Sequence, residues 1–362
     1  MKAISPAICT GCAFISMALK SDGTVWAWGV GTLGIGTRHQ KSIPVQVHDL
    51  SGVTAIATRQ ALKEDGTVWT WGGNKNGQLG DGTNSPRYVP VKVKDLSGVT
   101  AISAGMAVRE DGTVWTWGWN EFGQLGDGTT KNRRVPVQVQ NLSNVIAVSN
   151  GGRIHSLALR EDGTVWAWGK NDKGQLGNGT YENSTAPMQV SGLDGVMAIS
   201  AYHNSYALKK DGTVWAWGDN SVGQLGDGTT TSSNTPVQVQ GLEGVAAISV
   251  GAGHALALQK DGTVWAWGWN LSGQLGDGIA TKLVCNIYPP NPVPMKVQKI
   301  YDVVAVSAGT QHSLALCEDG TVWAWGSNLR GELGDGKRCE DSYIPVQVLG
   351  AKRKGFLNLK AE

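Results

Sequence analysis

Three groups of residues in this chain have the types and spacing that chemistry would need. A glycine-rich phrase, Gly-Gln-Leu-Gly-Asp-Gly, recurs at residues 77–82, 123–128, 223–228 and 273–278, and such glycines could cradle a phosphate or surround calcium. His155, His254 and His312 stand at one repeated position and could converge on a metal ion. Cys9 and Cys12 have the Cys-x-x-Cys spacing of zinc and redox sites. Each possibility depends on the elements that would position these side chains.

None of the three groups meets the requirements of its chemistry. A phosphate loop needs a Lys and a following helix, and the calcium β-helix needs a nine-residue period, so the glycine phrase is better explained by turns. Histidines at equivalent positions of a repeat lie far apart, and we expect each to hydrogen-bond a neighbouring repeat. No second Cys-x-x-Cys completes a zinc site, so we expect the five cysteines to be free and reduced. The sequence therefore predicts no catalytic residue, no metal and no cofactor.

The element that positions these residues is a second phrase, Asp-Gly-Thr-Val-Trp-Ala/Thr-Trp-Gly. It occurs at residues 22–29, 65–72, 111–118, 162–169, 211–218, 261–268 and 319–326. A repeat of roughly 40–60 residues is compatible with a four-stranded propeller blade or with a helical repeat. Abundant Val, Trp, Thr and Ile, together with 51 glycines, favours strands over helices.

The last unit shows how one repeat divides into strands. Residues 305–307, 312–316, 321–325 and 344–348 have strand character, and Asp319-Gly320 predicts a hairpin with a type I′ turn. Each strand alternates large and small side chains, so that the bulky face of one sheet fills the hollow of the next. We expect 14 of the 16 Trp to be core wedges of this kind.

This pattern predicts an all-β chain folded as one seven-bladed β-propeller with four-stranded antiparallel blades. The propeller is expected over residues 1–348, followed by a short basic C-terminal tail over residues 349–362. The net charge of +2 and the absence of a basic stripe argue against a nucleic-acid partner. No apolar run approaches the ~20 residues of a membrane span. We expect a cytoplasmic monomer, with a segment of a larger exported protein as the alternative.

The repeat resembles a known family. Ser-Ala-Gly-x-x-His-Ser-Leu-Ala-Leu, then Asp-Gly-Thr-Val-Trp-Ala-Trp-Gly, then Asn-x-x-Gly-Gln-Leu-Gly-Asp-Gly is similar to the regulator of chromosome condensation repeat, most closely at residues 307–336. The resemblance extends from Ala3 to about Val348, and its wording is closest to bacterial members. The family implies a seven-bladed propeller, in agreement with the count of repeats.

What the resemblance implies about function is diverse. The founding member is a guanine-nucleotide exchange factor for a small GTPase and contacts chromatin through a basic N-terminal tail, whereas only Lys2 is charged before Lys20 here. A plant member senses ultraviolet light through a Gly-Trp-Arg-His-Thr motif that this chain lacks. A bacterial member inhibits β-lactamase by presenting aromatic loops on one propeller face, and that mode transfers most easily.

Departures from the repeat mark where function could reside. The second and third units lack the Gly-x-x-His-Ser stretch, so that the third unit has four residues fewer than the seventh before its Asp-Gly turn. Shortened hairpins predict a notch on one face beside blades 2 and 3. The first unit is instead longer and is expected to bulge. The sixth unit carries a Pro-rich insertion at residues 279–293, either a surface loop or a docking finger.

These observations predict a non-enzymatic protein-interaction scaffold that presents loops to a protein partner, possible partners including a small GTPase. The alternatives are a guanine-nucleotide exchange factor and a proteinaceous enzyme inhibitor. The candidate partner-binding residues lie mainly in the loops between the third and fourth strands: Trp119, Phe122, Arg133, Arg134, Tyr181, Trp269 and Tyr288. The simpler interpretation of Arg133 and Arg134 is that they belong to a solvated surface.

Overall fold

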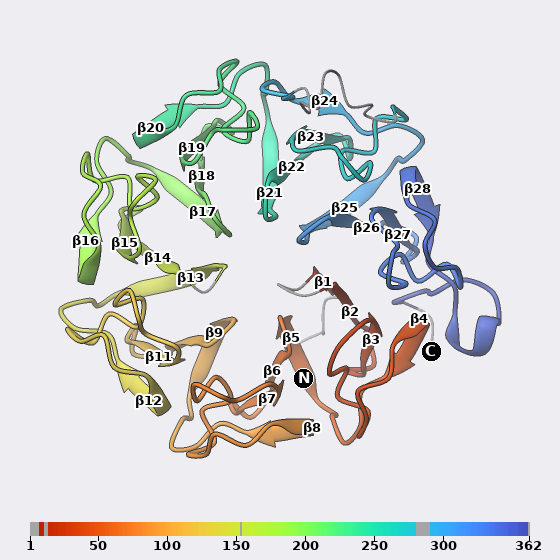
Figure 1. Cartoon of the computed structure of the whole chain (residues 1–362), viewed down its shortest axis with the longest axis horizontal. Helices are drawn as coiled ribbons and strands as arrows, with labels where there is room; N and C mark the ends of the chain where they lie inside the picture. The colour runs from red at the N-terminus through yellow and green to blue at the C-terminus, as the bar shows by residue number, and fades with distance from the viewer. Residues whose placement is uncertain (1–6, 11–13, 153, 280–289, 361–362) are drawn as a thin grey trace.

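The structure, a computed structural model, describes residues 7–10, 14–152, 154–279 and 290–360. Within these residues, four consecutive strands form each of seven antiparallel sheets, and the sheets are arranged in a ring (Figure 1). The predicted seven-bladed β-propeller is therefore confirmed, and each sequence repeat is one blade. In that described part of the chain, no helix has the length and apolar character needed to span a membrane.

The innermost strand of each blade comes first in the chain and the outermost comes last (Figure 1). Blades 1 to 3 consist of β1 (Ala7–Thr10), β2 (Ile15–Leu19), β3 (Val25–Gly29), β4 (Lys41–Gln46); β5 (Val53–Ala57), β6 (Gln60–Lys63), β7 (Val68–Gly72), β8 (Arg87–Lys92); and β9 (Val99–Ser103), β10 (Met106–Arg109), β11 (Val114–Gly118), β12 (Arg133–Gln138).

Blades 4 to 7 follow in the same order around the ring. They consist of β13 (Val145–Gly151), β14 (His155–Arg160), β15 (Val165–Gly169), β16 (Ser184–Gln189); β17 (Val196–Ala201), β18 (Ser205–Lys209), β19 (Val214–Gly218), β20 (Ser233–Gln238); β21 (Val245–Val250), β22 (His254–Gln259), β23 (Val264–Gly268), β24 (Met295–Lys296); and β25 (Val303–Ala308), β26 (His312–Cys317), β27 (Val322–Gly326), β28 (Ser342–Gln347). A short 3₁₀ helix, η1 (Ala351–Arg353), follows β28.

The Asp-Gly hairpins form as predicted, but not with the predicted turn. In blade 7 the N–H of Gly320 donates to the Cys317 carbonyl (2.9 Å), and Gly320 has a φ of +87° while Asp319 has no positive φ. A type I′ turn, which needs positive φ at both residues, is therefore wrong. The Asp319 carboxylate accepts hydrogen bonds from the N–H and hydroxyl of Thr321 (2.9 and 2.6 Å), which holds Asp319 in an ordinary conformation. The result is a type I turn followed by a left-handed Gly.

The second Trp of each phrase is the wedge between blades. Trp168 of blade 4 is fully buried, and its Nε1 donates to the Gln124 carbonyl of blade 3 (2.9 Å). Gly126 lies against the indole, where a Cβ atom would come within 2.8 Å of Nε1, so only glycine fits this socket. The equivalent bond to the preceding blade is made by Trp28, Trp117, Trp217, Trp267 and Trp325. The first Trp of each phrase is only half-buried.

The hydrophobic core consequently lies between blades rather than within them. One cluster joins Leu157 and Leu176 of blade 4 to Ala207 and Trp217 of blade 5. The last seam, between blades 7 and 1, also receives Leu357 and Leu359 from the segment after β28, which we expected to be a tail. The N–H of Ser21 in blade 1 donates to the Leu359 carbonyl (2.9 Å). Basic residues 352–354 of the same segment are exposed, as expected.

Candidate protein-binding face

Antiparallel order places the loops between first and second strands, and between third and fourth strands, at one face of the ring. We call this the loop face; the Asp-Gly turns lie at the opposite face. The first two strands have five and four residues in blades 2 and 3, against six and six in blades 6 and 7. The predicted loss of strand length in blades 2 and 3 is thus confirmed.

Where the hairpin is complete, its His joins two blades. The Nε2 atom of His155 lies 2.8 Å from the Ser205 hydroxyl of blade 5, and that hydroxyl donates to the Gln175 carbonyl (2.7 Å). Since the serine proton is used by the carbonyl, His155 carries its proton on Nε2 and donates it to serine. Equivalent pairs are His254–Ser313 (3.0 Å) and His312–Ser16 (2.9 Å). The predicted bond to a neighbouring blade is confirmed.

These histidines are neutral structural groups. Burial lowers the pKa of His155 and His254 to about 3 and that of His312 to about 4. A buried imidazole that stays uncharged at neutral pH suits a hydrogen bond to a hydroxyl. In the described residues, no group of three His, Cys, Asp or Glu side chains is placed to hold a metal ion. Cys317 and Cys339 are free thiols, while Cys12 and Cys285 lie outside the described residues.

In blades 2 and 3 the hairpins shrink to two-residue turns, and a different side chain links the blades. Gln60 of blade 2 is 1% exposed. Its Oε1 accepts from the N–H of Gly105 (2.9 Å), and its Nε2 donates to the Met106 carbonyl (3.2 Å) of blade 3. Gln60 was not predicted as a functional or linking residue, although the sequence carries a signal: Gln-Ala-Leu stands where complete units have Leu-Ala-Leu.

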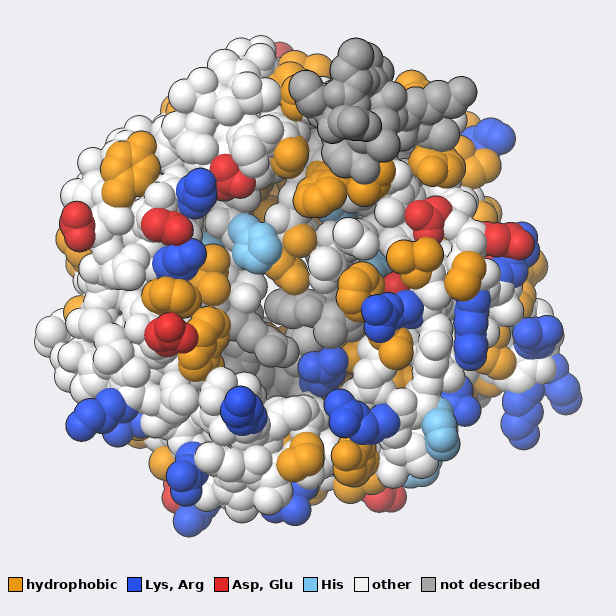
Figure 2. Space-filling model, viewed as in Figure 1, with side chains coloured by type: hydrophobic (Ala, Val, Ile, Leu, Met, Phe, Trp, Pro, Cys, Tyr) orange, Lys and Arg blue, Asp and Glu red, His pale blue; other side chains and the backbone are white. Residues whose placement is uncertain are grey.

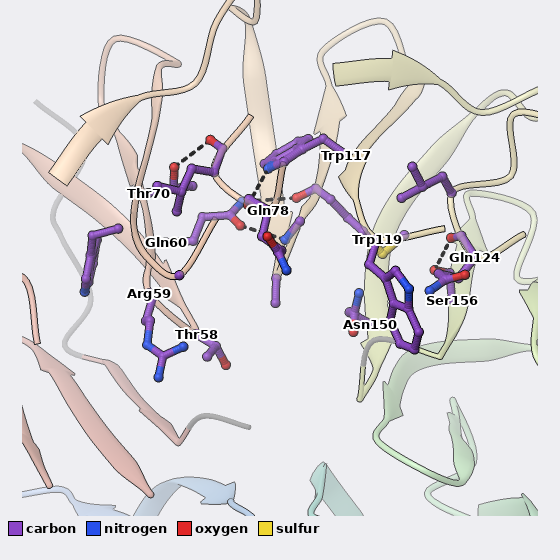
Figure 3. Close-up of a pocket in the computed structure, with 17 residues that line it drawn as sticks. Thr58, Arg59, Gln60, Thr70, Gln78, Trp117, Trp119, Gln124, Asn150 and Ser156 are labelled. Carbon is purple, nitrogen blue, oxygen red and sulfur yellow. Dashed lines mark hydrogen bonds between the residues drawn. The ribbon is translucent and has the colours of Figure 1, made fainter. Parts of the chain in front are cut away.

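The shortened hairpins leave a pocket, which we call the notch (Figure 3). Arg59 lies on one side of its opening and Trp119 and Asn150 lie on the other, with Gln60 and Gln78 between them. The cavity volume is about 80 Å³, enough for roughly three water molecules. Cofactor and drug-sized sites are usually about 300–1,000 Å³. The notch therefore suits one inserted side chain rather than a nucleotide or a metabolite.

Arg59 occupies a backbone position that favours glycine. It has a φ of +53° in its two-residue turn, and the equivalent residue in blade 3 is Gly105, with a φ of +71°. A left-handed conformation is costly for a residue with a Cβ atom, by about 1 kcal/mol. Residues held in such conformations cluster at functional sites. Arg59 therefore lines the notch from a backbone conformation that favours glycine.

Two of the predicted aromatic residues lie together beside the notch. The rings of Trp119 and Phe122 meet edge to face, with centroids 5.5 Å apart. The Nζ atom of Lys170 in blade 4 lies 5.3 Å from the Phe122 centroid, within range of a cation–π contact. Both rings are half-buried. Together they form an aromatic ledge beside the notch, which Trp119 also lines.

The remaining aromatic candidates are elsewhere on the loop face. Tyr181 of blade 4 is 54% exposed. Trp269 is half-buried in blade 6, which lies across the ring from blade 3 (Figure 1). Tyr288 and most of the Pro-rich insertion lie outside the described residues, as does the middle of the long first hairpin. The structure therefore brings Trp119 and Phe122 together but does not bring Trp269 to them.

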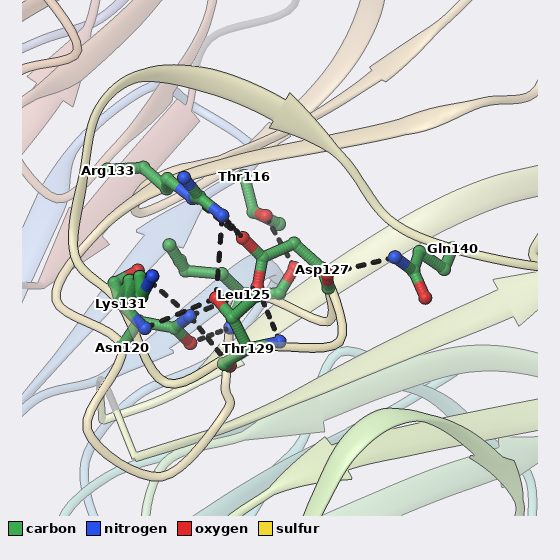
Figure 4. A network of polar contacts seen from close by, with 8 residues as sticks. All are labelled: Thr116, Asn120, Leu125, Asp127, Thr129, Lys131, Arg133 and Gln140. Atoms are coloured by element: carbon green, nitrogen blue, oxygen red, sulfur yellow. Dashed lines mark hydrogen bonds and ion pairs between the residues drawn. The ribbon is translucent and has the colours of Figure 1, made fainter.

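Arg133 belongs to the internal structure of its loop (Figure 4). Its guanidinium bonds the Asp127 carboxylate, with an Nη2–Oδ2 distance of 2.6 Å. Burial would raise the pKa of Asp127, but hydrogen bonds from Thr129 and Arg133 outweigh that effect and lower it. The neighbouring Arg134 is exposed. Arg133 is thus already paired with Asp127 of its own loop. Arg134 fits the simpler interpretation as a solvated residue.

The glycine-rich phrase is held by the side chain of the Asn that precedes it. Asn120 accepts from the N–H of Leu125 (2.8 Å) and donates to the Asp127 carboxylate (3.2 Å) and the Thr129 carbonyl (3.0 Å) (Figure 4). The same Asn-to-Leu bond recurs at Asn74, Asn171, Asn220, Asn270 and Asn328. The glycines therefore allow a loop that folds around its own polar side chains.

Comparison with known proteins identifies the family. The family model for the regulator of chromosome condensation (RCC1) repeat matches residues 22–58, 65–107, 111–159, 162–203, 211–258, 261–316 and 319–358. The chain therefore belongs to the RCC1 repeat family.

Individual relatives match shorter stretches. The human protein RCC2 is 43% identical over 47 residues, which are 13% of this chain and 9% of RCC2. The ultraviolet-B receptor UVR8 of Arabidopsis thaliana is 32% identical over 197 residues, which are 54% of this chain and 33% of UVR8. The matched part is thus a third or less of the length of these curated relatives.

A solved structure with the same architecture is that of yeast RCC1 (Prp20) bound to Kap60. It superposes with a TM-score of 0.81 and 24% identity, covering 92% of this chain and 85% of the yeast chain. At this level of identity the likeness establishes the propeller fold alone.

Proposed function

We propose that this propeller is a non-enzymatic binding module that holds a protein partner on its loop face, over blades 2 to 4. The observation that carries the proposal is the notch, which exists because two hairpins are shortened and which is bordered by the Trp119–Phe122 ledge. Large, half-buried aromatic side chains beside a recess are typical of binding hot spots. The small cavity volume argues for a protein side chain as its occupant.

Affinity purification from native lysate tests this proposal. The wild-type protein and the Trp119→Ala variant are used as baits, and Trp269→Ala across the ring is the matched control. We expect a protein retained by wild type and Trp269→Ala to be lost or strongly reduced with Trp119→Ala. Equal retention by all three baits contradicts the use of this part of the loop face.

Guanine-nucleotide exchange is the second candidate, because the fold is shared with yeast RCC1 (Prp20), which a second structure describes by its binding to Gsp1p and histones. Exchange needs only binding that loosens the nucleotide, which a notch without catalytic groups can supply. Release of a fluorescent nucleotide from a panel of small GTPases tests it. Acceleration that depends on Trp119 makes the partner a GTPase, whereas no acceleration leaves the binding module without exchange activity. Enzyme inhibition is the third candidate. In that case a captured protein is expected to be an enzyme whose activity falls when this propeller binds it.

A further inference from the structure

The segment after β28 forms a short hairpin at the rim of the ring, over residues 349–356, which we call the rim hairpin. Leu349 and Phe356 pair in it as an antiparallel bridge. Directly after the hairpin, Leu357 and Leu359 are buried in the seam between blades 7 and 1. The rim hairpin is thus anchored at its base, while its tip, which includes η1, projects from the edge of the ring (Figure 1).

The tip of the rim hairpin has a backbone conformation that its residues do not favour. The N–H of Lys354 donates to the Ala351 carbonyl (3.1 Å), and the two residues between them, Lys352 and Arg353, have φ of +54° and +61°. Positive φ at both central residues marks a type I′ turn, for which Asn-Gly is strongly preferred. Residues with a Cβ atom adopt such conformations at a cost and do so mainly at functional sites. A role for the two charges explains this pair better than the stability of the turn does.

The charges at the tip are not neutralised by neighbouring carboxylates. Residues 352–354 are exposed and take part in no ion pair within the part of the chain that the structure describes. The Arg353 guanidinium donates to the Gly336 carbonyl (3.2 Å), which holds the hairpin against the loop of Arg338, a further exposed cation. Figure 2 shows Lys and Arg side chains gathered at the edge of the molecule where η1 lies in Figure 1. Such a cluster attracts a negatively charged partner.

An aromatic side chain is exposed in the same hairpin. Phe356 is 56% exposed, whereas the adjacent Leu357 is 5% exposed. The Phe356 ring therefore has apolar area that it can remove from water by contact with a partner. Positive charge and an exposed aromatic ring together are typical of segments that lie at the boundary between the headgroups and acyl chains of a bilayer.

From these observations we infer that the rim hairpin binds the surface of a membrane that contains anionic lipids. Residues 352–354 lie among the lipid headgroups, and the Phe356 ring enters the boundary between headgroups and acyl chains. This is adsorption to one leaflet and requires no spanning segment. The inference does not rest on the proposed function, because the rim hairpin lies beside blades 7 and 1, whereas the notch lies in blades 2 and 3.

Two other anionic partners use less of what the rim hairpin offers. A nucleic-acid site usually spreads its cations along a face or a stripe, whereas these cations are confined to one tip. An acidic polypeptide would use the charges and leave the Phe356 ring in water. The nearby Glu340 carboxylate is already paired with Lys337 (2.9 Å) and leaves the tip free for headgroups.

Co-sedimentation of the full chain with unilamellar vesicles tests the inference. We expect binding to vesicles of equal parts phosphatidylcholine and phosphatidylserine, little binding to phosphatidylcholine alone, and weaker binding at high salt. Lys352→Asn combined with Arg353→Gly should weaken binding roughly 25-fold, because each Lys or Arg near an anionic surface contributes roughly fivefold. Since Asn-Gly is the preferred pair in this turn, the midpoint of thermal unfolding should stay the same or rise.

The matched control is Lys210→Gln combined with Lys260→Gln, which removes two exposed lysines from the Asp-Gly turns of blades 5 and 6 and should bind vesicles like wild type. Phe356→Ala should weaken binding several-fold at low and at high salt, because salt does not screen an apolar contact. The inference is overturned by equal binding to both kinds of vesicle, by no binding to either, or by wild-type affinity in the Lys352→Asn, Arg353→Gly variant or in Phe356→Ala. It is also overturned if a DNA duplex or polyglutamate binds the rim hairpin more tightly than the anionic vesicles do.

Discussion

Blades 4 and 6 and blades 2 and 3 are built from one repeat but join their neighbours in different ways. In blades 4 and 6 a full hairpin carries a His that bonds a serine of the next blade. In blades 2 and 3 the hairpin is a two-residue turn, and Gln60 forms the link through backbone atoms of blade 3. The Trp wedge is common to both regions, so the hairpin can be shortened without loss of the ring. The shortened hairpins leave the notch on the loop face.

The largest effect we expect is a loss of unfolding free energy, which should be large at the Trp wedge and small at the rim of the notch. Trp168→Ala should destabilise the protein by about 3–5 kcal/mol, because it removes a fully buried indole and its bond to the Gln124 carbonyl. Trp119→Ala, at the residue directly after the same phrase in blade 3, should cost less than about 1 kcal/mol, because the ring is half-buried. Urea denaturation followed by Trp fluorescence measures both. Similar losses would contradict the division between wedge and binding residue.

The sequence was informative wherever one repeat could be compared with another. Counting residues between the Ser and the Asp-Gly turn located the notch, and the repeated position of His155 indicated a bond to the next blade. The same comparison marks Gln60 as a departure from the repeat, but its role was not predicted, because its bonds cross the seam to backbone atoms of blade 3. The closing contribution of Leu359 was missed because it joins residues more than 300 positions apart, which no local pattern reports.

The same limit applies to the aromatic candidates. Trp119 and Phe122 are three residues apart in one loop, and their contact follows from that loop. Trp269 has the same place in its repeat, but equivalent places in blades 3 and 6 lie on opposite sides of the ring. A position within the repeat therefore predicts the face on which a residue lies and not its neighbours.

The next largest effect compares the two kinds of link between blades. His155→Ala should cost about 3 kcal/mol, since it creates a cavity and removes a buried hydrogen bond to Ser205. Gln60→Ala should cost about 2 kcal/mol, because the N–H of Gly105 and the Met106 carbonyl lose their partner. Denaturant midpoints measured together give the comparison. A Gln60→Ala variant as stable as wild type would show that Gln60 is not a link.

Lengthening the short turn of blade 3 should give this blade the complete hairpin that blade 4 has. Replacing Ala104-Gly105 with Asn-Gly-Gly-Arg-Ile-His-Ser, the residues 150–156 of blade 4, supplies a His and a Ser at the missing positions. Their partners are already present, because the Ser156 hydroxyl and the Gln78 carbonyl both line the notch. We expect stability within about 1 kcal/mol of wild type and a loss of partner binding of at least tenfold, measured by polarisation. Retained binding would mean that the notch is not the site.

The smallest effect on stability that we expect concerns Glu332, which departs from the repeat in a blade with a complete hairpin. Glu332 of blade 7 stands where five other loops have Gln, and it is fully buried with Oε1 unpaired among the described residues. Burial, the largest influence, raises its pKa from 4.5. A carboxyl with a raised pKa binds its proton more tightly in the folded state, so its ionised form costs stability above the folded pKa, and this cost disappears below the unfolded value.

Glu332→Gln should therefore stabilise the protein by about 1 kcal/mol at pH 7, and the gain should shrink as the pH falls toward 4. The backbone N–H of Arg330, which donates to Oε2 of Glu332 (2.7 Å), is expected to find the Oε1 acceptor of Gln, as the N–H of Phe122 does at Gln124 (2.9 Å). Unfolding midpoints of both proteins from pH 4 to pH 7 measure the effect. A gain that is independent of pH would assign the difference to packing rather than to charge, and a loss would show that the seam between blades 7 and 1 requires the carboxyl group.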